Sequence, residues 1–140
     1  MRLMLDTNVL VKVCHPSGYR DVQEWFRGLL TRAGGAPEIM ISVLADYEYR
    51  RGLVAANAVA GLRFLDELER SLRLVPVTVD ASRLAADLRH RLGGGPQPSD
   101  ADLLMAAQAE VEGAILVTSD RALRSIPGLE ARDWNEIDGA

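Results

Sequence analysis

Four acidic residues of this 140-residue sequence stand where they could share one site: Asp6, Glu48, Asp102 and Asp120. Asp6 ends the short apolar run 3–5, and Asp120 ends the run 115–119. Both runs are typical of buried strands in a parallel sheet, where the carboxyl ends of strands face the ligand crevice. Glu48 follows the apolar run 39–42 and Asp102 opens an apolar helix, so all four can reach the same edge. Four carboxylates facing one another favour a bound cation.

Each acid also has a purely structural interpretation. Asp6 and Asp120 could be helix N-caps, because an aspartate accepts the unpaired amide protons of a first turn. Asp102 completes a capping box begun by Ser99, and Glu48 could be a solvated helix residue. Taken singly, these roles are the simpler explanation. Their joint placement favours a shared site, because strands 1 and 4 of a sheet ordered 3-2-1-4-5 are neighbours at the switch point.

The spacing of neighbouring acids separates candidate ligands from bystanders. Residues two apart on a helix point about 200° away from each other. Asp46 and Glu48 therefore cannot easily share a site, and neither can Asp100 and Asp102. We choose Glu48 and Asp102 as ligands and keep Asp100 as a reserve ligand. The other member of each pair would still be a favourable charge near the positive end of its helix dipole.

Short β-like runs alternate with helical ones along the chain, which predicts a parallel sheet covered by helices. We expect strands that cover residues 2–5, 39–42, 74–79, 115–119 and about 129–132. We expect helices over residues 7–13, 22–33, 43 to about 52, 59–72, 84–92, 100 to about 112, and 121–125. Pro76 indicates that the third strand lies at an edge, since proline cannot donate to a ladder. The result is an α/β fold with about five strands and seven helices in one domain, residues 1–140.

Composition excludes several classes of protein. The length and the 48% hydrophobic content suffice for one core. The single cysteine, Cys14, excludes an internal disulfide and a multi-cysteine metal site, and is expected to be a small buried residue. No apolar stretch approaches the roughly 18 residues that span a bilayer, and an acid at position 6 comes too early for a signal peptide. We therefore expect a cytoplasmic protein with no membrane association.

The net charge of -4 argues against bulk electrostatic binding of nucleic acid, but only weakly. Two divalent ions at the acids would add four positive charges and bring the loaded protein to neutrality. Every basic residue except Lys12 is an arginine, and guanidinium groups suit bidentate phosphate contacts. A bias in coding towards arginine explains this composition equally well.

A glycine- and proline-rich segment, two histidines and two tyrosines are further features that bear on function. The segment 93–98, rich in Gly and Pro, lies immediately before the third acid, and could be a mobile flap or a plain solvent loop. His15 and His90 lie outside every motif and are expected at the surface. Tyr47 and Tyr49 flank Glu48 and are expected to pack, with stacking on a base as the alternative.

Four segments of the sequence resemble the PIN-domain nucleases, and within them the VapC-like toxins of bacterial toxin–antitoxin pairs. They are Leu5-Asp6-Thr7-Asn8-Val9-Leu10; Ser42-Val43, followed by Glu48 and Gly52; Asp102-Leu103-Leu104-Met105-Ala106-Ala107; and Leu116-Val117-Thr118-Ser119-Asp120. Any one of them is a weak signal. Together, in this order and in a chain of this length, they cover nearly the whole sequence and make a strong one.

The resemblance implies a three-layer α/β/α sandwich and an Mg²⁺- or Mn²⁺-dependent endoribonuclease. It implies that the metal is held by Asp6, Glu48, Asp102 and Asp120, with Asn8 and Thr118 as polar support. The last acid varies within the family, which makes Asp120 the least constrained. The expected partners are an RNA substrate, a cognate antitoxin protein and a second copy of the chain. The antitoxin is expected to lay an amphipathic helix along the N-terminal helices and insert an Arg or Lys among the acids.

The chemistry agrees with this resemblance. Carboxylates without His or Cys suit Mg²⁺ better than zinc, and such an ion acidifies water for attack on a phosphodiester. Single-stranded or looped RNA has a splayed backbone that can enter a narrow acidic cleft. Phosphate contacts are expected from some of the arginines near the rim, with solvated surface charge as the alternative for the others: Arg20, Arg50, Arg51, Arg121 and Arg124.

Other functions fit the sequence less well. A receiver-like phospho-acceptor module would need paired acids near strand 1 and a Lys after strand 5, and no Lys follows residue 12. A phosphatase with Asp6 as nucleophile would need a proton donor two residues on, where Asn8 stands. A binding subunit would not need the intact quartet. A PIN-fold RNA-processing nuclease without an antitoxin remains an alternative to the toxin.

Overall fold

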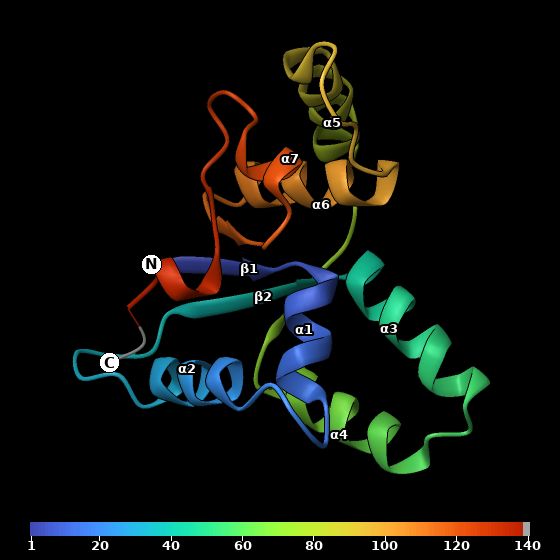
Figure 1. Ribbon diagram of the computed structural model, residues 1–140, viewed down its shortest axis with the longest axis vertical. Coiled ribbons are helices and arrows are strands. Elements are labelled where there is room, and N and C mark those ends of the chain that lie inside the picture. Colours follow the sequence, from blue (N-terminus) through green and yellow to red (C-terminus); the bar gives the residue numbers. More distant parts are fainter. Residues whose placement is uncertain (139–140) are drawn as a thin grey trace.

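The computed structural model describes residues 1–138 and has a parallel five-stranded sheet at its centre (Figure 1). The strands are β1 (Arg2–Leu5), β2 (Glu38–Ser42), β3 (Arg73–Val75), β4 (Ile115–Val117) and β5 (Ala131–Arg132). Their order is β3-β2-β1-β4-β5, which confirms the predicted order. Leu5, the last residue of β1, is the register partner of both Ile41 and Val117. The residues that follow β1 and β4 are therefore neighbours at one edge of the sheet.

Seven α-helices flank the sheet within the described residues, as predicted. They are α1 (Thr7–Cys14), α2 (Arg20–Leu30), α3 (Val43–Ala55), α4 (Val59–Arg70), α5 (Val79–Leu92), α6 (Asp100–Val111) and α7 (Arg121–Arg124), followed by the 3-10 turn η1 (Trp134–Glu136). Figure 1 shows α5, α6 and α7 on one side of the sheet and α1, α2 and α4 on the other, with α3 beyond the end of β2. None of the helices in residues 1–138 has the length and apolar character needed to cross a bilayer.

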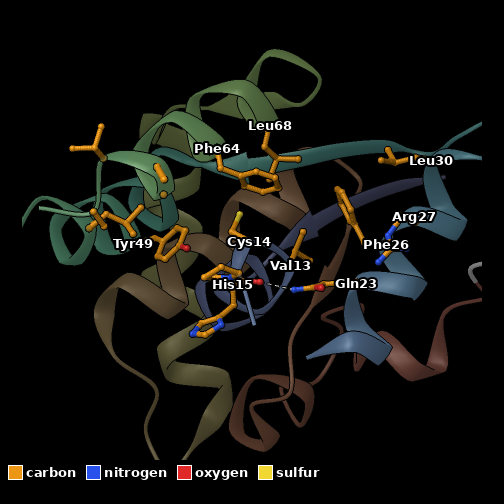
Figure 2. Close-up of a pocket in the computed structure, with 16 residues that line it drawn as sticks. Val13, Cys14, His15, Gln23, Phe26, Arg27, Leu30, Tyr49, Phe64 and Leu68 are labelled. Atoms are coloured by element: carbon orange, nitrogen blue, oxygen red, sulfur yellow. Dashed lines mark hydrogen bonds between the residues drawn. The ribbon is translucent and has the colours of Figure 1, made fainter. Parts of the chain in front are cut away.

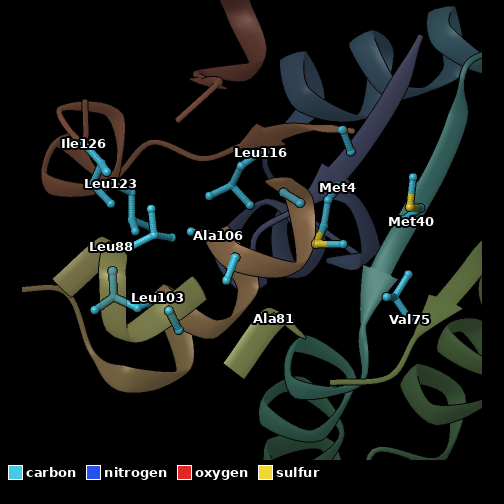
Figure 3. Packing of buried hydrophobic residues seen from close by; sticks show 14 residues of the cluster. Met4, Met40, Val75, Ala81, Leu88, Leu103, Ala106, Leu116, Leu123 and Ile126 are labelled. Atoms are coloured by element: carbon cyan, nitrogen blue, oxygen red, sulfur yellow. The ribbon is translucent and has the colours of Figure 1, made fainter. Parts of the chain in front are cut away.

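Successive side chains of the strands point to opposite faces of the sheet and pack into two separate hydrophobic clusters, one on each face. Met4 and Leu116 point to the α5–α6–α7 side, where they pack with Leu88 and Leu103 (Figure 3). Leu3 and Leu5 belong to the cluster on the other side, with Trp25 and other side chains of α1 and α2. Because side chains of a strand alternate between faces, continuous apolar strands such as β1 must be covered on both faces. The structure is accordingly a three-layer sandwich.

The third strand is shorter than predicted. Residues 74–79 were expected to form it, but it ends at Val75 and α5 begins at Val79. Pro76 has no N–H to give to the sheet, and Thr78 caps α5 by accepting from the Ala81 N–H at 3.1 Å. The chain therefore leaves the sheet four residues early. The predicted edge position of the strand is confirmed.

Several helix boundaries and faces also differ from the prediction. Helix α2 ends at Leu30, which leaves Ala33 outside it and exposed. Helix α3 runs through Gly52 to Ala55. In α6, Val111 is 46% exposed, while Met105 is fully buried. Helix α6 packs against α5, β4 and α3 and is buried almost all round, so its short apolar residues do not mark one face.

The segment 93–98 is held by hydrogen bonds of its own and of α5. Arg89 donates to Gln97 Oε1 at 2.9 Å and to the Pro98 carbonyl at 2.8 Å. Gln97 in turn donates to the carbonyls of Gly93 and Gly95. Pro98 is buried. The segment is therefore fastened to α5, the helix that precedes it.

Candidate metal centre

Asp6 lies at the end of β1 and is almost fully buried. Only 5% of its surface is exposed. Its Oδ1 accepts a hydrogen bond from the Thr7 N–H at 2.8 Å, which caps α1, and its Oδ2 accepts one from the Thr118 hydroxyl at 2.8 Å. Both carboxylate oxygens are thus fixed in direction, and each keeps lone pairs for another partner.

Thr118 connects Asp6 to Asp120. Its hydroxyl oxygen accepts from the Asp120 N–H at 3.1 Å while its proton goes to Asp6. Asp120 Oδ1 caps α7 by accepting from the N–H groups of Ala122 and Leu123. The pairing of β1 with β4 creates this arrangement, because it aligns Leu5 with Val117 and so places the next residues of both strands side by side. Capping and clustering are therefore compatible in the same two acids.

The electrostatics of Asp6 show that other acids lie nearby. The pKa of Asp6 is raised from 3.8 to about 6, mainly by burial, and the negative charges of Asp102 and Asp120 contribute to this rise. The hydrogen bonds from Thr118 and Thr7 act in the opposite direction. Asp6, Asp102 and Asp120 consequently share one region of negative potential at the switch point between β1 and β4.

The start of α6 separates the two acids that the sequence offered there. Ser99 caps the helix by accepting from the Asp102 N–H at 3.1 Å. The Asp102 side chain is half-buried and close enough to act on Asp6. The Asp100 side chain is 95% exposed and pairs with Arg89 at 2.8 Å. The structure thus brings Asp102 towards Asp6 and turns Asp100 towards α5.

Glu48 differs from Asp102 and Asp120 in that it is not among the acids whose charge raises the pKa of Asp6. It lies half-buried on α3, the helix that Ser42 caps. Among residues 1–138, no three His, Cys, Asp or Glu side chains converge closely enough to form a ready-made metal shell. Asn8 lies in the first turn of α1 and is exposed.

The donor set fits a hard divalent cation. All of the acids supply oxygen, and Mg²⁺ retains several waters, so it can be held by one or two carboxylates directly and by others through water. Zinc would require close convergence of four ligands, commonly with His or Cys. The separation of these carboxylates and the negative potential around Asp6 therefore suit Mg²⁺ or Mn²⁺.

The candidate phosphate-binding arginines differ in their surroundings. Arg50 is held by three acids: Asp46 at 2.9 Å, Asp66 at 2.9 Å and Glu69 at 3.0 Å. Burial, followed by a hydrogen bond with Asp46, raises the pKa of Glu69 to about 7, although Arg50 opposes this shift. Arg50 therefore ties α3 to α4.

The other four arginines are more accessible or less fully paired. Arg124 pairs with Glu136 at 3.4 Å, and Arg51 lies over the ring of Tyr47, 5.4 Å from its centroid. Arg20 and Arg121 are exposed, and neither forms an ion pair with another described residue. These two are the freest guanidinium groups of the candidate set.

Gln108 is a buried polar residue that the sequence analysis did not single out. It lies on α6, is 1% exposed, and makes side-chain hydrogen bonds to Ser42 and to the Val75 carbonyl. A signal for it exists in the sequence, because Gln108 stands alone among the apolar residues 103–109. A helix that is apolar all round is buried, and its one amide must then find partners inside the protein.

A large apolar groove lies between α1, α2, α3 and α4, on the side of the sheet opposite α5, α6 and α7 (Figure 2). Its volume is about 950 Å³. The walls include Val13, Phe26, Tyr49, Phe64 and Leu68, and Phe64 is 51% exposed. None of the four candidate acids is among its described lining residues.

Two residues of the groove had predicted positions; the prediction for Cys14 is confirmed and the one for His15 is wrong. Cys14 is buried as predicted, and burial raises the pKa of its thiol to about 12. His15 was expected at the surface, outside any site, but it is half-buried and contributes to the groove. The Gln23 side-chain amide donates to the His15 carbonyl at 2.7 Å and fixes this end of α1 (Figure 2). Arg27 gives the groove its positive charge.

Comparison with known proteins agrees with this architecture. The sequence matches the PIN domain family over residues 3–129. No curated protein matches it. The structure superposes on a chain of the DNA-bound VapBC2 complex from Rickettsia felis with a TM-score of 0.80, at 24% identity, covering 96% of this chain and 99% of that one.

Two further structures have the same fold. For DNA-bound VapBC from Salmonella typhimurium, the TM-score is 0.69 at 25% identity, with 96% of this chain and 98% of that chain covered. For VapC20 from Mycobacterium tuberculosis, described as a sarcin–ricin loop cleaving toxin, the TM-score is 0.65 at 19% identity, with 93% and 98% covered. The structural neighbours are thus toxins of the VapC type.

Proposed function

The chain belongs to the PIN domain family, and on that premise we propose that it is an Mg²⁺- or Mn²⁺-dependent endoribonuclease, the toxin of a toxin–antitoxin pair. The observation that carries the proposal is the group formed by Asp6, Asp102 and Asp120, in which burial and neighbouring charge raise the pKa of Asp6. A carboxylate is kept in such surroundings at a cost in stability, and sites with strongly perturbed pKa values are often functional.

The strand order argues against the phospho-acceptor alternative. A receiver domain has its strands in the order 2-1-3-4-5, which places strand 3 beside strand 1. Here β1 lies between β2 and β4. The neighbour of Asp6 is therefore the end of β4, which carries Thr118 and Asp120, and not a strand with an acceptor aspartate.

In the proposed site, Asp6, Asp102 and Asp120 would hold the ion, with Glu48 as a further ligand. When bound, the ion supplies a Lewis acid and makes a water more acidic for attack on the phosphodiester. Thr118 keeps the Asp6 carboxylate in one orientation through its hydrogen bond to Oδ2. The combined negative charge of the acids attracts the cation, and it repels RNA phosphates when no cation is bound.

RNA is the proposed substrate, and its phosphates need cations outside the acidic group. Arg20 and Arg121 are the best candidates, because they are exposed and free of ion pairs with other described residues. Arg51 and Arg124 are weaker candidates. Arg50 is surrounded by three carboxylates, so its charge is largely neutralised. We therefore expect loss of Arg20 or Arg121 to weaken RNA binding more than loss of Arg50.

The groove is the proposed docking site for a segment of the antitoxin. Structural neighbours of this fold were crystallised as toxin–antitoxin complexes, and an exposed apolar surface of this size usually marks an interaction site. Its walls are largely apolar and Arg27 is its charged residue. The segment is therefore expected to be an amphipathic helix with an acidic residue placed to meet Arg27.

Cleavage of a defined RNA set tests the proposed activity. We expect cutting by the wild type with Mn²⁺ or Mg²⁺, none with EDTA, and none by Asp6→Asn. Asp102→Asn and Asp100→Asn form a matched pair, because both remove one carboxylate from the first turn of α6. The proposal expects Asp102→Asn to lose activity and Asp100→Asn to keep it. The assigned site would be contradicted if RNA were cleaved equally well with and without the metal, or if only Asp100→Asn lost activity.

A further inference from the structure

A buried set of hydrogen bonds joins the helices that carry Glu48 and Asp102. Ser42 Oγ donates to Gln108 Oε1 at 2.5 Å, and Gln108 Nε2 donates to the Val75 carbonyl at 3.1 Å. Ser42 is fully buried and Gln108 is 1% exposed. Ser42 caps α3, which carries Glu48, and Gln108 lies on α6, which carries Asp102.

The hydrogen-bonding capacity of Ser42 makes this link directional. A serine hydroxyl has one proton to donate and lone pairs with which to accept. The oxygen accepts from the Leu44 N–H at 3.0 Å and so caps α3, while the proton goes to Gln108. One hydroxyl therefore fixes the start of α3 and binds it to α6 at the same time.

The side-chain amide of Gln108 is hydrogen-bonded to the ends of two neighbouring strands, β2 and β3. Its two partners, Ser42 and Val75, are register neighbours across β2 and β3. The oxygen can only accept and the nitrogen can only donate, so a shift of α6 along these strand ends would leave buried polar groups unpaired. An apolar side chain of similar size would permit such a shift.

We propose that Gln108 is a positioning residue: it fixes the position of α3 relative to α6 and thereby sets the distance between Glu48 and Asp102. The inference rests on the proposed metal-dependent function. Mg²⁺ requires near-ideal octahedral geometry, so a small displacement of α3 against α6 weakens its binding. Removal of residues that support metal ligands commonly lowers metal affinity about 10-fold to 100-fold.

Manganese affinity of Gln108→Met tests the inference, because methionine keeps the length of the side chain and removes both hydrogen bonds. Binding of Mn²⁺ alone is measured by calorimetry and by the EPR spectrum of the bound ion, at a temperature where circular dichroism shows each variant to be folded. We expect the affinity to fall about tenfold, with a broadened or altered EPR spectrum. Activity on RNA is not needed for this readout.

Trp25→Phe is the matched control for loss of stability. Trp25 Nε1 donates to the Ile137 carbonyl at 3.0 Å, so this variant also removes a buried hydrogen bond from a side chain to the backbone. Trp25 belongs to the apolar cluster on the other side of the sheet and has no link to α3 or α6 in that bond. We expect a comparable fall in melting temperature and an unchanged Mn²⁺ affinity.

Variants of Ser42 test whether the bond itself is responsible. Ser42→Thr keeps the hydroxyl and should retain Mn²⁺ affinity, whereas Ser42→Ala should lose it. If both residues act through one bond, the double variant Ser42→Ala with Gln108→Met should bind Mn²⁺ only slightly more weakly than the single variant that has the lower affinity. Full additivity of the two losses would contradict the inference.

The remaining outcomes separate the inference from the function on which it rests. Wild-type protein that binds no Mn²⁺ would overturn the proposed metal site, and the inference with it. Wild-type protein that binds Mn²⁺ no better than Gln108→Met would overturn the inference alone. Equal losses of affinity in Gln108→Met and Trp25→Phe would also overturn it, because the effect would then follow general stability.

Discussion

Asp6 is at once a helix cap, a member of an acidic group and a buried charge. In the folded protein its pKa is raised from 3.8 to about 6, first by burial and then by the nearby acids. A carboxyl group with a raised pKa contributes stability below its unfolded pKa, and that contribution is lost as the pH rises through about 6. At neutral pH the metal-free protein therefore holds this charge at the expense of its own stability.

We expect Asp6→Asn to be more stable than the wild type in EDTA at pH 8, by on the order of 2 kcal/mol. Asparagine keeps an oxygen for the Thr7 N–H and removes the buried charge. The difference should shrink as the pH falls to about 4, where Asp6 is protonated in the wild type. Thermal melts across this pH range provide the measurement, with Asp133→Asn, a cap of η1, as the control. A difference that does not change with pH would show that the charge is not its cause.

The same pair of proteins separates a ligand from a cap. Divalent ions that bind only the folded protein raise its melting temperature by mass action. We expect Mn²⁺ to raise the melting temperature of the wild type and to have little effect on Asp6→Asn. If Mn²⁺ shifted both proteins equally, Asp6 would be a cap alone.

Thr118 should matter through its hydroxyl and not through its shape. Thr118→Val keeps the volume but removes the donor to Asp6 and the acceptor for the Asp120 N–H. The loss should destabilise the protein by about 1–3 kcal/mol, since buried polar groups are left unpaired. Chemical denaturation measures this change, and Thr118→Ser should recover most of it. Equal stability of the Val and Ser variants would contradict the bridging role.

At the level of helices and strands, the sequence was most informative where burial follows a regular pattern. The apolar strands and the sheet order were predicted correctly, because two-sided burial leaves a continuous apolar run. Boundaries were harder, since Pro76 and the cap at Thr78 end β3 through local backbone chemistry. The apolar run 103–109 signals that Gln108 is buried, but its hydrogen-bond partners depend on how α6 packs against other elements, which no pattern within that helix reveals.

The candidate site could be predicted in part for a similar reason. Residues at the ends of neighbouring strands follow from the topology, which is why Asp6, Thr118 and Asp120 were placed together. The position of Glu48 relative to them depends on the tilt of α3 beyond the sheet, and the sequence contains no measure of that tilt. Arg50 was a candidate for RNA contact because its acidic partners on α4 are distant in sequence.

The segment 93–98 was open to two interpretations, and its hydrogen bonds favour a fastened loop. We expect Arg89→Ala to release it, because this variant removes the donors to Gln97 and to the Pro98 carbonyl. Hydrogen–deuterium exchange over residues 93–98 should become faster. Arg83→Ala, an exposed position on the same helix, is the control and should leave exchange unchanged. Rapid exchange already present in the wild type would instead indicate a mobile flap.

For the molecule as a whole, the acids and the groove are separate features that α3 links. Helix α3 carries Glu48, one of the proposed ligands, and Tyr49 of the same helix lines the groove. A partner seated in the groove would therefore touch the helix that supplies one of the proposed ligands. If the proposed function is right, we expect that the separation allows antitoxin binding and RNA cleavage to be altered independently.

We expect Phe64→Glu to abolish binding of the antitoxin while the isolated protein still cleaves RNA. Phe64 is half-exposed at the groove, so the charge costs little in the free protein but would be buried in the complex. Co-purification with the protein encoded immediately upstream provides the measurement, and Val77→Glu, an exposed apolar position outside the groove, is the control. Retained binding by Phe64→Glu would place the antitoxin elsewhere.

The long separation between Asp6 and Thr118 has a consequence during synthesis on the ribosome. The two residues are 112 positions apart, and β1 lies in the middle of the sheet between β2 and β4. At about 5–20 residues per second, roughly 6–20 s pass between translation of the first residue and translation of the second. Until then Asp6 lacks Thr118 and Asp120. A nascent chain is therefore unable to assemble the acidic group, and the ribosome that makes it is not exposed to a completed site.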